Sequence, residues 1–164
     1  MEKKYILTEE TKEVGGRILH RIQAVRDFDA VQKGDLGGWV ESEENLSHDG
    51  NCWVFGDGRV FGNGKIFDNG RVFGDGEVFG NARIGVNAYI SSPRSYFVQG
   101  PIGSRDDFLT YYLDKDKKIY AVTGCFFGTL EEFEKKVKET HGSNKHAKQY
   151  LKAAEMARVM LSGD

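Results

Sequence analysis

The 164-residue sequence has little cysteine and little proline, and it contains no long apolar run. Its two cysteines, Cys52 and Cys125, lack the paired spacing of a metal site and are too few for a disulfide scaffold, which favours a reducing compartment. We therefore expect no metal and no cofactor. The first residues, MEKKYILTEETKE, hold no stretch that could act as a signal peptide or cross a membrane. These absences predict a cytoplasmic protein without a membrane partner.

An excess of charge of one sign is also absent, because 23 Lys and Arg residues stand against 25 Asp and Glu residues. A net charge of -2 argues against nucleic acid as a partner. Glycine and phenylalanine are abundant instead, with 21 and 11 residues. A short repeat accounts for much of this excess.

The repeat has six residues and fills positions 50–91 without insertion. Its units read GNCWVF, GDGRVF, GNGKIF, DNGRVF, GDGEVF, GNARIG and VNAYIS. A β-branched aliphatic residue holds the fifth place of every unit, and a small residue lies two places before it. These two places share one face, because side chains alternate across a strand. Asn or Asp precedes every small residue, which is typical of a tight turn.

A short strand and a tight corner in every six residues predict a triangular coil with three units per turn. The aliphatic residue would point inward, and successive turns would pair as parallel strands about 4.8 Å apart. The repeat therefore resembles the left-handed β-helix of hexapeptide-repeat proteins. A propeller or a meander is the alternative, but six residues are too few for a hairpin and its return.

Residues 18 apart would stack on the same outer face of such a coil. Five phenylalanines would then point outward: Phe55, Phe61, Phe67, Phe73 and Phe79. A contiguous apolar surface of this size usually marks an interface. Either flanking segments of the same chain cover it, or a homo-oligomer, a trimer or dimer, does so. Lys65 would lie over Arg83, and this like-charge pair costs stability unless an anion or an acidic partner lies across it.

The segments around the repeat complete a mainly β fold, a left-handed parallel β-helix with an N-terminal β-hairpin and a C-terminal ββαα unit. Residues 1–33 predict the hairpin, with its turn at Gly15-Gly16, as a cap on the coil. Residues 34–95 would hold the β-helix, including a degenerate first turn whose end Trp39 plugs.

The C-terminal unit is predicted over residues 96–164. DFLTYYL and KIYAVTGCFF read as two strands around the charged turn DKDK. Thr129 and Glu132 form a capping box ahead of a short helix, which ends at His141-Gly142. Asn144 would cap a last helix, whose apolar residues recur at helical spacing.

Three segments carry a more specific resemblance than the repeats do. They read VQKGDLGGWVESEENLSHDGNCWVFG from Val31, GPIGSRDD, and GCFFGTLEEFEKKVKETHG. Together with the repeats they resemble phage and prophage hexapeptide-repeat proteins, which are often labelled acyltransferases. The resemblance spans about residues 18–150. It implies a phage-linked protein in the cytoplasm of a bacterial host, with the blocking of bacterial defence as one role.

An acyltransferase of this fold class needs a histidine that acts as general base. The four histidines of the chain are His20, His48, His141 and His146. Each is interpreted more simply as a surface or capping residue, and the repeat lacks the longer coil and the extruded loop of hexapeptide enzymes. We therefore assign no catalytic residue. Cys52 and Cys125 are interpreted as buried apolar residues rather than nucleophiles.

The best candidate site is the segment GPIGSRDD, residues 100–107. Its glycines permit close approach of the backbone, while a hydroxyl and a guanidinium can bind a phosphate or a carboxylate. A neighbouring chain could add the two cations of the coil. The predicted anion-binding residues are thus Gly103, Ser104, Arg105, Lys65 and Arg83. The alternative is a connecting turn in which Arg105 pairs with Asp106 or Asp107.

The sequence therefore predicts a non-catalytic, oligomeric binding protein with an anti-defence role. It would sequester a phosphorylated, nucleotide-like small molecule, or it would occlude a host defence protein. Two other classes stay open, namely a hexapeptide-repeat acyltransferase and a structural oligomer such as a virion component.

Overall fold

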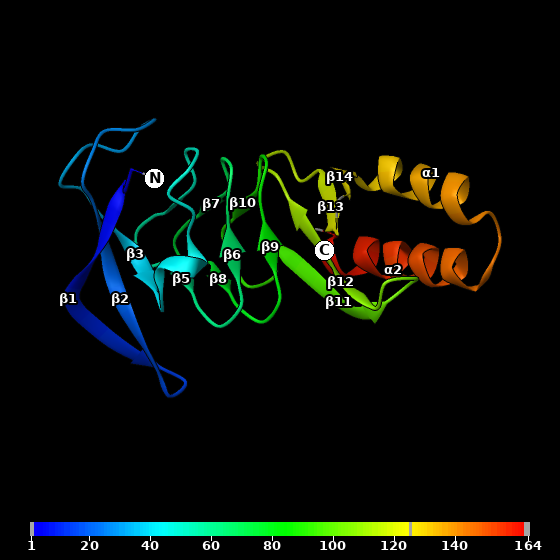
Figure 1. The fold of residues 1–164 in the computed structure, drawn as a ribbon, viewed down its shortest axis with the longest axis horizontal. Helices are drawn as coiled ribbons and strands as arrows, with labels where there is room; N and C mark the ends of the chain where they lie inside the picture. The colour runs from blue at the N-terminus through cyan, green and yellow to red at the C-terminus, as the bar shows by residue number, and fades with distance from the viewer. Residues whose placement is uncertain (1, 125, 163–164) are drawn as a thin grey trace. The chain divides into compact units, whose positions relative to one another are not determined.

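A computed structural model describes residues 2–124 and 126–162 of the chain. The fold is mainly β, with two α-helices in its C-terminal part, and it divides between Pro93 and Arg94 into two compact units (Figure 1). Cys125, for which the sequence predicts burial, lies outside the described residues. None of the helices within the described ranges has the length and apolar character needed to span a bilayer.

The predicted N-terminal hairpin is present. Strands β1 (Tyr5–Val14) and β2 (Arg17–Ala24) pair in antiparallel fashion around a turn in which Gly15 and Gly16 both have positive φ. Strand β3 (Leu36–Val40) pairs with β2 in antiparallel fashion and with β5 (Arg59–Val60) in parallel fashion. The strand β3 therefore joins the hairpin to the repeat region.

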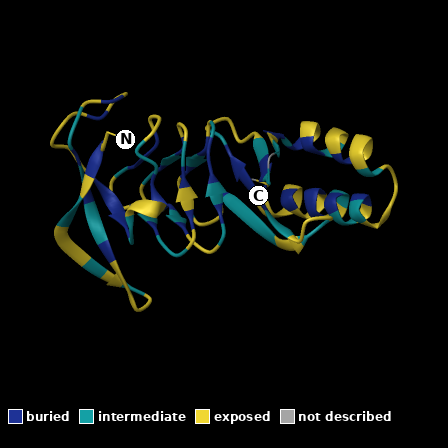
Figure 2. Cartoon of the chain, viewed as in Figure 1, coloured by how far each residue is buried: buried dark blue, intermediate teal, exposed yellow. Residues whose placement is uncertain are grey.

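The repeat region forms two-residue strands that pair in parallel at the predicted spacing of 18 residues. These strands are β4 (Trp53–Val54), β5, β6 (Lys65–Ile66), β7 (Arg71–Val72), β8 (Glu77–Val78), β9 (Arg83–Ile84) and β10 (Tyr89–Ile90). They form separate ladders, β4-β7-β10, β5-β8 and β6-β9, and β3 extends the second of these. The aliphatic residue of every strand is at most 1% exposed, so the inward face is confirmed (Figure 2).

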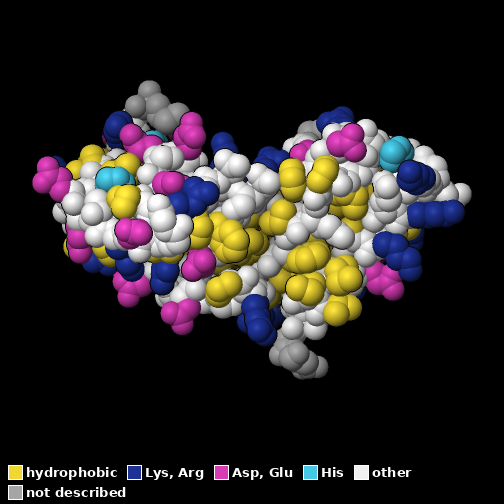
Figure 3. Space-filling model, turned by 90° about the horizontal axis from the view of Figure 1, so that it is seen from below, with side chains coloured by type: hydrophobic (Ala, Val, Ile, Leu, Met, Phe, Trp, Pro, Cys, Tyr) yellow, Lys and Arg dark blue, Asp and Glu magenta, His cyan; other side chains and the backbone are white. Residues whose placement is uncertain are grey.

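The predicted outward columns of aromatic rings are also present. Phe55 stacks on Phe73 with ring centroids 4.7 Å apart, and Phe61 stacks on Phe79 at 5.3 Å. Phe67 instead faces Gly85, where a Cβ atom would overlap the aromatic ring. Phe79 remains 44% exposed, and the other four rings are half-buried. Hydrophobic side chains are visible at the surface in Figure 3, and the predicted interface stays a prediction.

The first turn of the repeat region is irregular, as predicted, and Trp39 differs from its predicted role. The turn pairs Trp39 with Arg59 and Leu46 with Ile66, so it is two residues longer than the regular turns. Trp39 takes an outward place in its ladder, where Lys12 and Arg21 lie over its ring. The prediction that Trp39 plugs the coil was therefore wrong, because the alternation along β3 turns Val40 inward instead.

The extra length of this turn is accommodated by a short 3-10 helix, η1 (Glu43–Asn45). Its last residue, Asn45, is 1% exposed and its amide nitrogen donates to the carbonyl oxygens of Gly62 and Gly64, at 3.2 and 2.8 Å. The amide oxygen of Asn45 accepts from the backbone nitrogens of Glu41 and Ser42. Through its side chain, Asn45 thus joins this short helix to the following turn of the repeat region.

The C-terminal unit contains an antiparallel sheet and two helices. The sheet order is β11 (Tyr96–Ile102), β12 (Asp107–Leu113), β13 (Ile119–Thr123) and β14 (Phe126–Thr129), followed by α1 (Leu130–His141) and α2 (Lys145–Leu161). The predicted ββαα unit was wrong in its number of strands. The segment from Tyr96 forms an additional strand that pairs with β12, in spite of Gly100 and Pro101. The predicted second strand, KIYAVTGCFF, divides at Gly124 into β13 and β14, and Gly124 has a φ of 47°.

The helices of this unit begin and end as predicted. Thr129 and Glu132 form the capping box of α1, Gly142 ends it with a φ of 61°, and the Asn144 side chain caps α2. One face of the sheet packs on both helices and makes the core of the unit. Its buried apolar residues include Leu109, Tyr111, Leu113, Ala121, Leu130, Phe133, Val137, Ala154 and Ala157.

Candidate functional site

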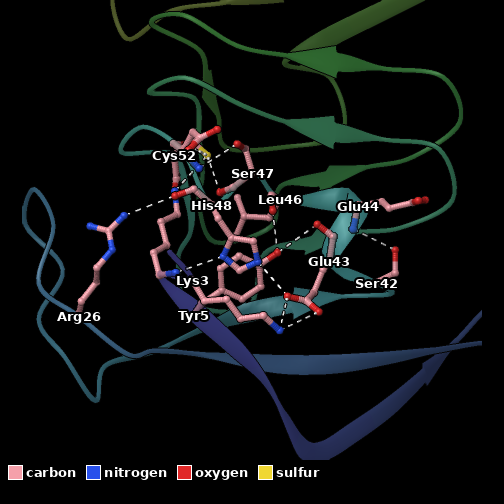
Figure 4. A network of polar contacts seen from close by, with 12 residues as sticks. Lys3, Tyr5, Arg26, Ser42, Glu43, Glu44, Leu46, Ser47, His48 and Cys52 are labelled. Carbon is pink, nitrogen blue, oxygen red and sulfur yellow. Dashed lines mark hydrogen bonds and ion pairs between the residues drawn. The ribbon is translucent and has the colours of Figure 1, made fainter. Parts of the chain in front are cut away.

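His48 lies in a polar network that joins the start of the chain to the first turn of the repeat region (Figure 4). Its Nδ1 accepts from the backbone nitrogen of Lys4 at 3.1 Å, so its Nε2 carries the proton and donates to Glu43 at 2.8 Å. Its ring also stacks on Tyr5 with centroids 4.2 Å apart. Both ring nitrogens are therefore engaged, and His48 is poorly placed to take a proton from a substrate.

The same network buries Lys4 completely. The Nζ atom of Lys4 donates to the carbonyl oxygens of Gly50 and Cys52, at 3.2 and 2.7 Å, and to the sulfur of Cys52 at 3.3 Å. Burial lowers the pKa of the Lys4 ammonium and raises the pKa of the Cys52 thiol. Cys52 has 0% exposure, which confirms its predicted inward place. These contacts hold the hairpin against the coil.

The predicted anion-binding turn joins β11 to β12 in the C-terminal unit. Gly103 has a φ of 80°, and its Cα lies so close to the Tyr150 ring that an added Cβ would overlap it. The backbone nitrogen of Ser104 donates to the Tyr150 hydroxyl at 3.2 Å. Helix α2 therefore fixes the conformation of this turn.

A cavity of about 190 Å³ opens beside this turn, within the C-terminal unit. Its cationic or titratable nitrogens belong to Arg105, Lys136 and His141. The rest of its lining consists of hydroxyl, carboxylate and apolar side chains with one glycine, namely Ser104, Thr123, Thr140, Tyr150, Asp107, Phe126, Phe133, Val137 and Gly124. The lining thus combines hydrogen-bond donors with aromatic and aliphatic side chains.

Asp107 is the acidic residue that lines this cavity, and hydrogen bonds already engage its carboxylate. One oxygen accepts from the backbone nitrogen of Gly124 at 3.1 Å, and the other accepts from that of Phe108 at 2.8 Å. These bonds hold the carboxylate in its place at the hairpin between β13 and β14. Asp107 therefore has a structural role in the wall of the cavity.

Sequence reasoning missed the part of this cavity that the helices supply. Lys136, Thr140 and His141 come from α1, and Tyr150 comes from α2, far from residues 100–107 in the sequence. One signal was available, because Lys136 and Thr140 lie four residues apart and so share a helix face. Nothing in the sequence places that face against the turn.

Lys65 and Arg83 lie in the other unit of the chain. They are direct neighbours in the ladder of β6 and β9, as predicted, and both line a hollow of about 240 Å³ with Glu44, Ser47, Ile66 and Phe67. Of the five residues predicted to bind an anion, Ser104 and Arg105 therefore line one hollow, Lys65 and Arg83 line another, and Gly103 lines neither. Three belong to the unit that follows Pro93, and two belong to the unit that precedes Arg94.

Comparison with known proteins gives a partial similarity. No family model matches the chain. An uncharacterized acetyltransferase of Escherichia coli (strain K12), YdcK, is 38% identical over 61 residues, which cover 32% of this chain and 19% of that protein. The chain thus spans about a fifth of the length of the curated relative it matches. The similarity is to an acyltransferase-like protein and carries no information on a phage origin.

Proposed function

We propose that the chain is a non-catalytic binding protein that holds a phosphorylated small molecule in the cavity of its C-terminal unit. The supporting observation is the convergence of Arg105, Lys136 and His141 on one cavity together with the hydroxyls of Ser104 and Thr140. A guanidinium binds two phosphate oxygens at once, and an ammonium adds a point charge. Hydroxyl groups complete the donor set.

The remaining lining favours a ligand that carries a ring. Phe126, Phe133 and Val137 form an apolar wall beside the polar groups. At about 190 Å³ the cavity is smaller than the roughly 300 to 1,000 Å³ of ordinary ligand pockets. A mononucleotide-like molecule would therefore place its phosphate and part of its base or sugar inside, with the rest in solvent.

The wider proposal concerns the repeat region and the biological setting. We take the three parallel ladders as faces of a left-handed β-helix, which their 18-residue spacing supports. A second or third copy of the chain would cover the columns of phenylalanine rings. In a phage-infected cell, such an oligomer would sequester a nucleotide-like signal of the host or occlude a defence protein.

The test is calorimetry of the whole chain with adenosine monophosphate and with inorganic phosphate. Arg105→Ala and Lys136→Ala should each weaken binding roughly 10- to 150-fold, because each removes a charge-assisted contact worth roughly 1.5 to 3 kcal/mol. Lys148→Ala is the matched control, since this exposed lysine of α2 does not line the cavity. If the wild-type chain binds neither probe, or if all three variants bind equally, the proposed site is wrong.

The second candidate function is an acyltransferase, and the similarity to YdcK favours it. His141 would then be the general base, because it lines the cavity whereas both nitrogens of His48 are engaged. Turnover of acetyl-CoA with an amine acceptor, lost in His141→Ala and kept in His48→Ala, would establish this function in place of the first. Binding of adenosine monophosphate without turnover would support the non-catalytic protein.

A further inference from the structure

Lys4 and Cys52 form a buried contact outside the proposed ligand site. The Nζ atom of Lys4 lies 3.3 Å from the sulfur of Cys52, although the two residues are 48 positions apart. Both residues have 0% exposure. The carbonyl oxygens of Gly50 and Cys52 hold the same nitrogen, so its position against the sulfur is fixed.

Among the described residues, the amine of Lys4 is the nucleophile that lies against the sulfur of Cys52. Cys52 is a free thiol, and its other close contacts are the backbone carbonyl oxygens of Ser47, Ile66 and Asp49, at 3.5, 3.7 and 3.8 Å. A carbonyl oxygen does not react with an oxidised sulfur, whereas a neutral amine does. Burial favours the neutral amine of Lys4, because it lowers the pKa of the ammonium group.

We propose that Lys4 and Cys52 are a site of oxidative modification, at which hydrogen peroxide joins Nζ to Sγ through one bridging oxygen atom. In the first step the sulfur attacks one peroxide molecule and becomes a sulfenic acid, with release of one water. In the second step a second peroxide molecule is reduced to two waters. An N–H bond and the sulfenic O–H bond break, and the N–O bond forms.

The geometry favours this product over a direct bond between nitrogen and sulfur. An oxygen atom spans most of the 3.3 Å separation, so the two side chains need to move only slightly. A direct bond would pull Lys4 away from the carbonyl oxygens that hold it. A dithiol reduces the bridge. Four hydrogen atoms from the reductant convert the N–O–S link back to the amine, the thiol and one water.

Such a link would fasten the residue before β1 to the first regular unit of the repeat. The hairpin and the coil are otherwise joined here by hydrogen bonds, including that from Tyr5 to Leu46 at 2.6 Å. A covalent link across 48 residues restricts the unfolded chain, as a disulfide does. Oxidation should therefore raise the melting temperature, and a dithiol should lower it again.

The experiment treats the whole chain, carrying Cys125→Ser so that Cys52 is its one thiol, with hydrogen peroxide and analyses the peptides by mass spectrometry. We expect a linked pair of peptides containing Lys4 and Cys52, heavier than their sum by one oxygen and lighter by two hydrogens. Trypsin should no longer cleave after Lys4, and dithiothreitol should restore both the cleavage and the free thiol.

Lys4→Arg is the matched control, because it keeps the positive charge but offers no nucleophilic amine. In this variant peroxide should leave sulfenic or sulfinic acid on Cys52, with no linked peptide. The proposal is overturned if the chain with Lys4 gives the same products as Lys4→Arg. It is also overturned if Cys52 stays a thiol while Lys4 remains a substrate for trypsin. The second readout uses only the chain with its own Lys4, so it does not depend on the folding of the variant.

Discussion

At the scale of single residues, Gly103 shows how one position shapes the candidate site. Its φ of 80° is a conformation that other residues rarely adopt, and Tyr150 fills the space where a side chain would begin. The turn that carries Ser104 and Arg105 can approach α2 only because this residue has no Cβ. The position of Ser104 and Arg105 in the cavity wall therefore depends on Gly103, which has no side chain to contact a ligand.

Gly103→Ala is expected to destabilise the C-terminal unit by about 2 to 4 kcal/mol, since backbone strain and overlap with Tyr150 add. Gly142→Ala is the matched control, because its φ is 61° but nothing lies within 4 Å of the added Cβ. The control should cost only the strain, about 1 kcal/mol. Urea denaturation followed by circular dichroism measures both, and equal losses would contradict the role given to Tyr150.

At the scale of elements, an ion pair between Arg158 and Glu134 joins α2 to α1. Arg158 donates to both oxygens of Glu134, at 2.8 and 2.6 Å, and approaches Glu131 at 3.4 Å. The Arg158 guanidinium holds the pKa of the Glu134 carboxyl below its usual value. The pair therefore stabilises the folded chain above the unfolded-state pKa of this carboxyl. That contribution is lost as the pH falls through the lower folded-state pKa.

Glu134→Gln should lower the stability by about 0.5 to 1 kcal/mol at pH 7, because solvent screens a pair whose Arg158 is 43% exposed. The difference from the wild type should vanish well below pH 4.5, the ordinary carboxyl value, where both chains carry an uncharged group. Thermal melting at several pH values measures this. Glu139→Gln, on an exposed turn of the same helix, serves as control, and an equal loss there would refute the role given to the ion pair.

The sequence predicts the elements of this chain well where the pattern is local. The aliphatic place of each repeat, the corners and the helix caps depend on residues within six positions of one another, and all of these predictions are confirmed. Strand β11 was missed because Gly100 and Pro101 read as a turn, although pairing with β12 outweighs that local preference. The cavity was missed in part because the contact of Lys136 and His141 with the turn depends on helix packing, which no local pattern encodes.

At the scale of the whole molecule, the repeat region acts as a stack with a fixed period. The ladders between β4 and β10 join residues 18 apart, so the removal of one full turn should leave the remaining strands in register. Deletion of residues 68–85 removes 18 residues and would place β10 directly on β4. Deletion of residues 68–86 removes one residue more, which would turn Tyr89 inward and Ile90 outward.

The shorter deletion should therefore retain a cooperative melting transition at a reduced temperature, because it loses the buried area of one turn. The longer deletion should lose cooperative melting or melt at a clearly lower temperature, because it forces the ring of Tyr89 into the inward place of a small residue and leaves Ser91 in the place of an aliphatic one. Differential scanning calorimetry of both chains makes the comparison. Equal melting behaviour would mean that the period does not govern the stability of the stack.

Strand β3 pairs with an antiparallel neighbour, β2, on one side and with a parallel neighbour, β5, on the other. The exposed end of a parallel stack is a template on which further strands can polymerise. On this face β2 already occupies that end, and the outer strand β1 carries Glu9, Glu10, Lys12 and Glu13 along its length. The hairpin thereby blocks the addition of further strands at this end of the ladder.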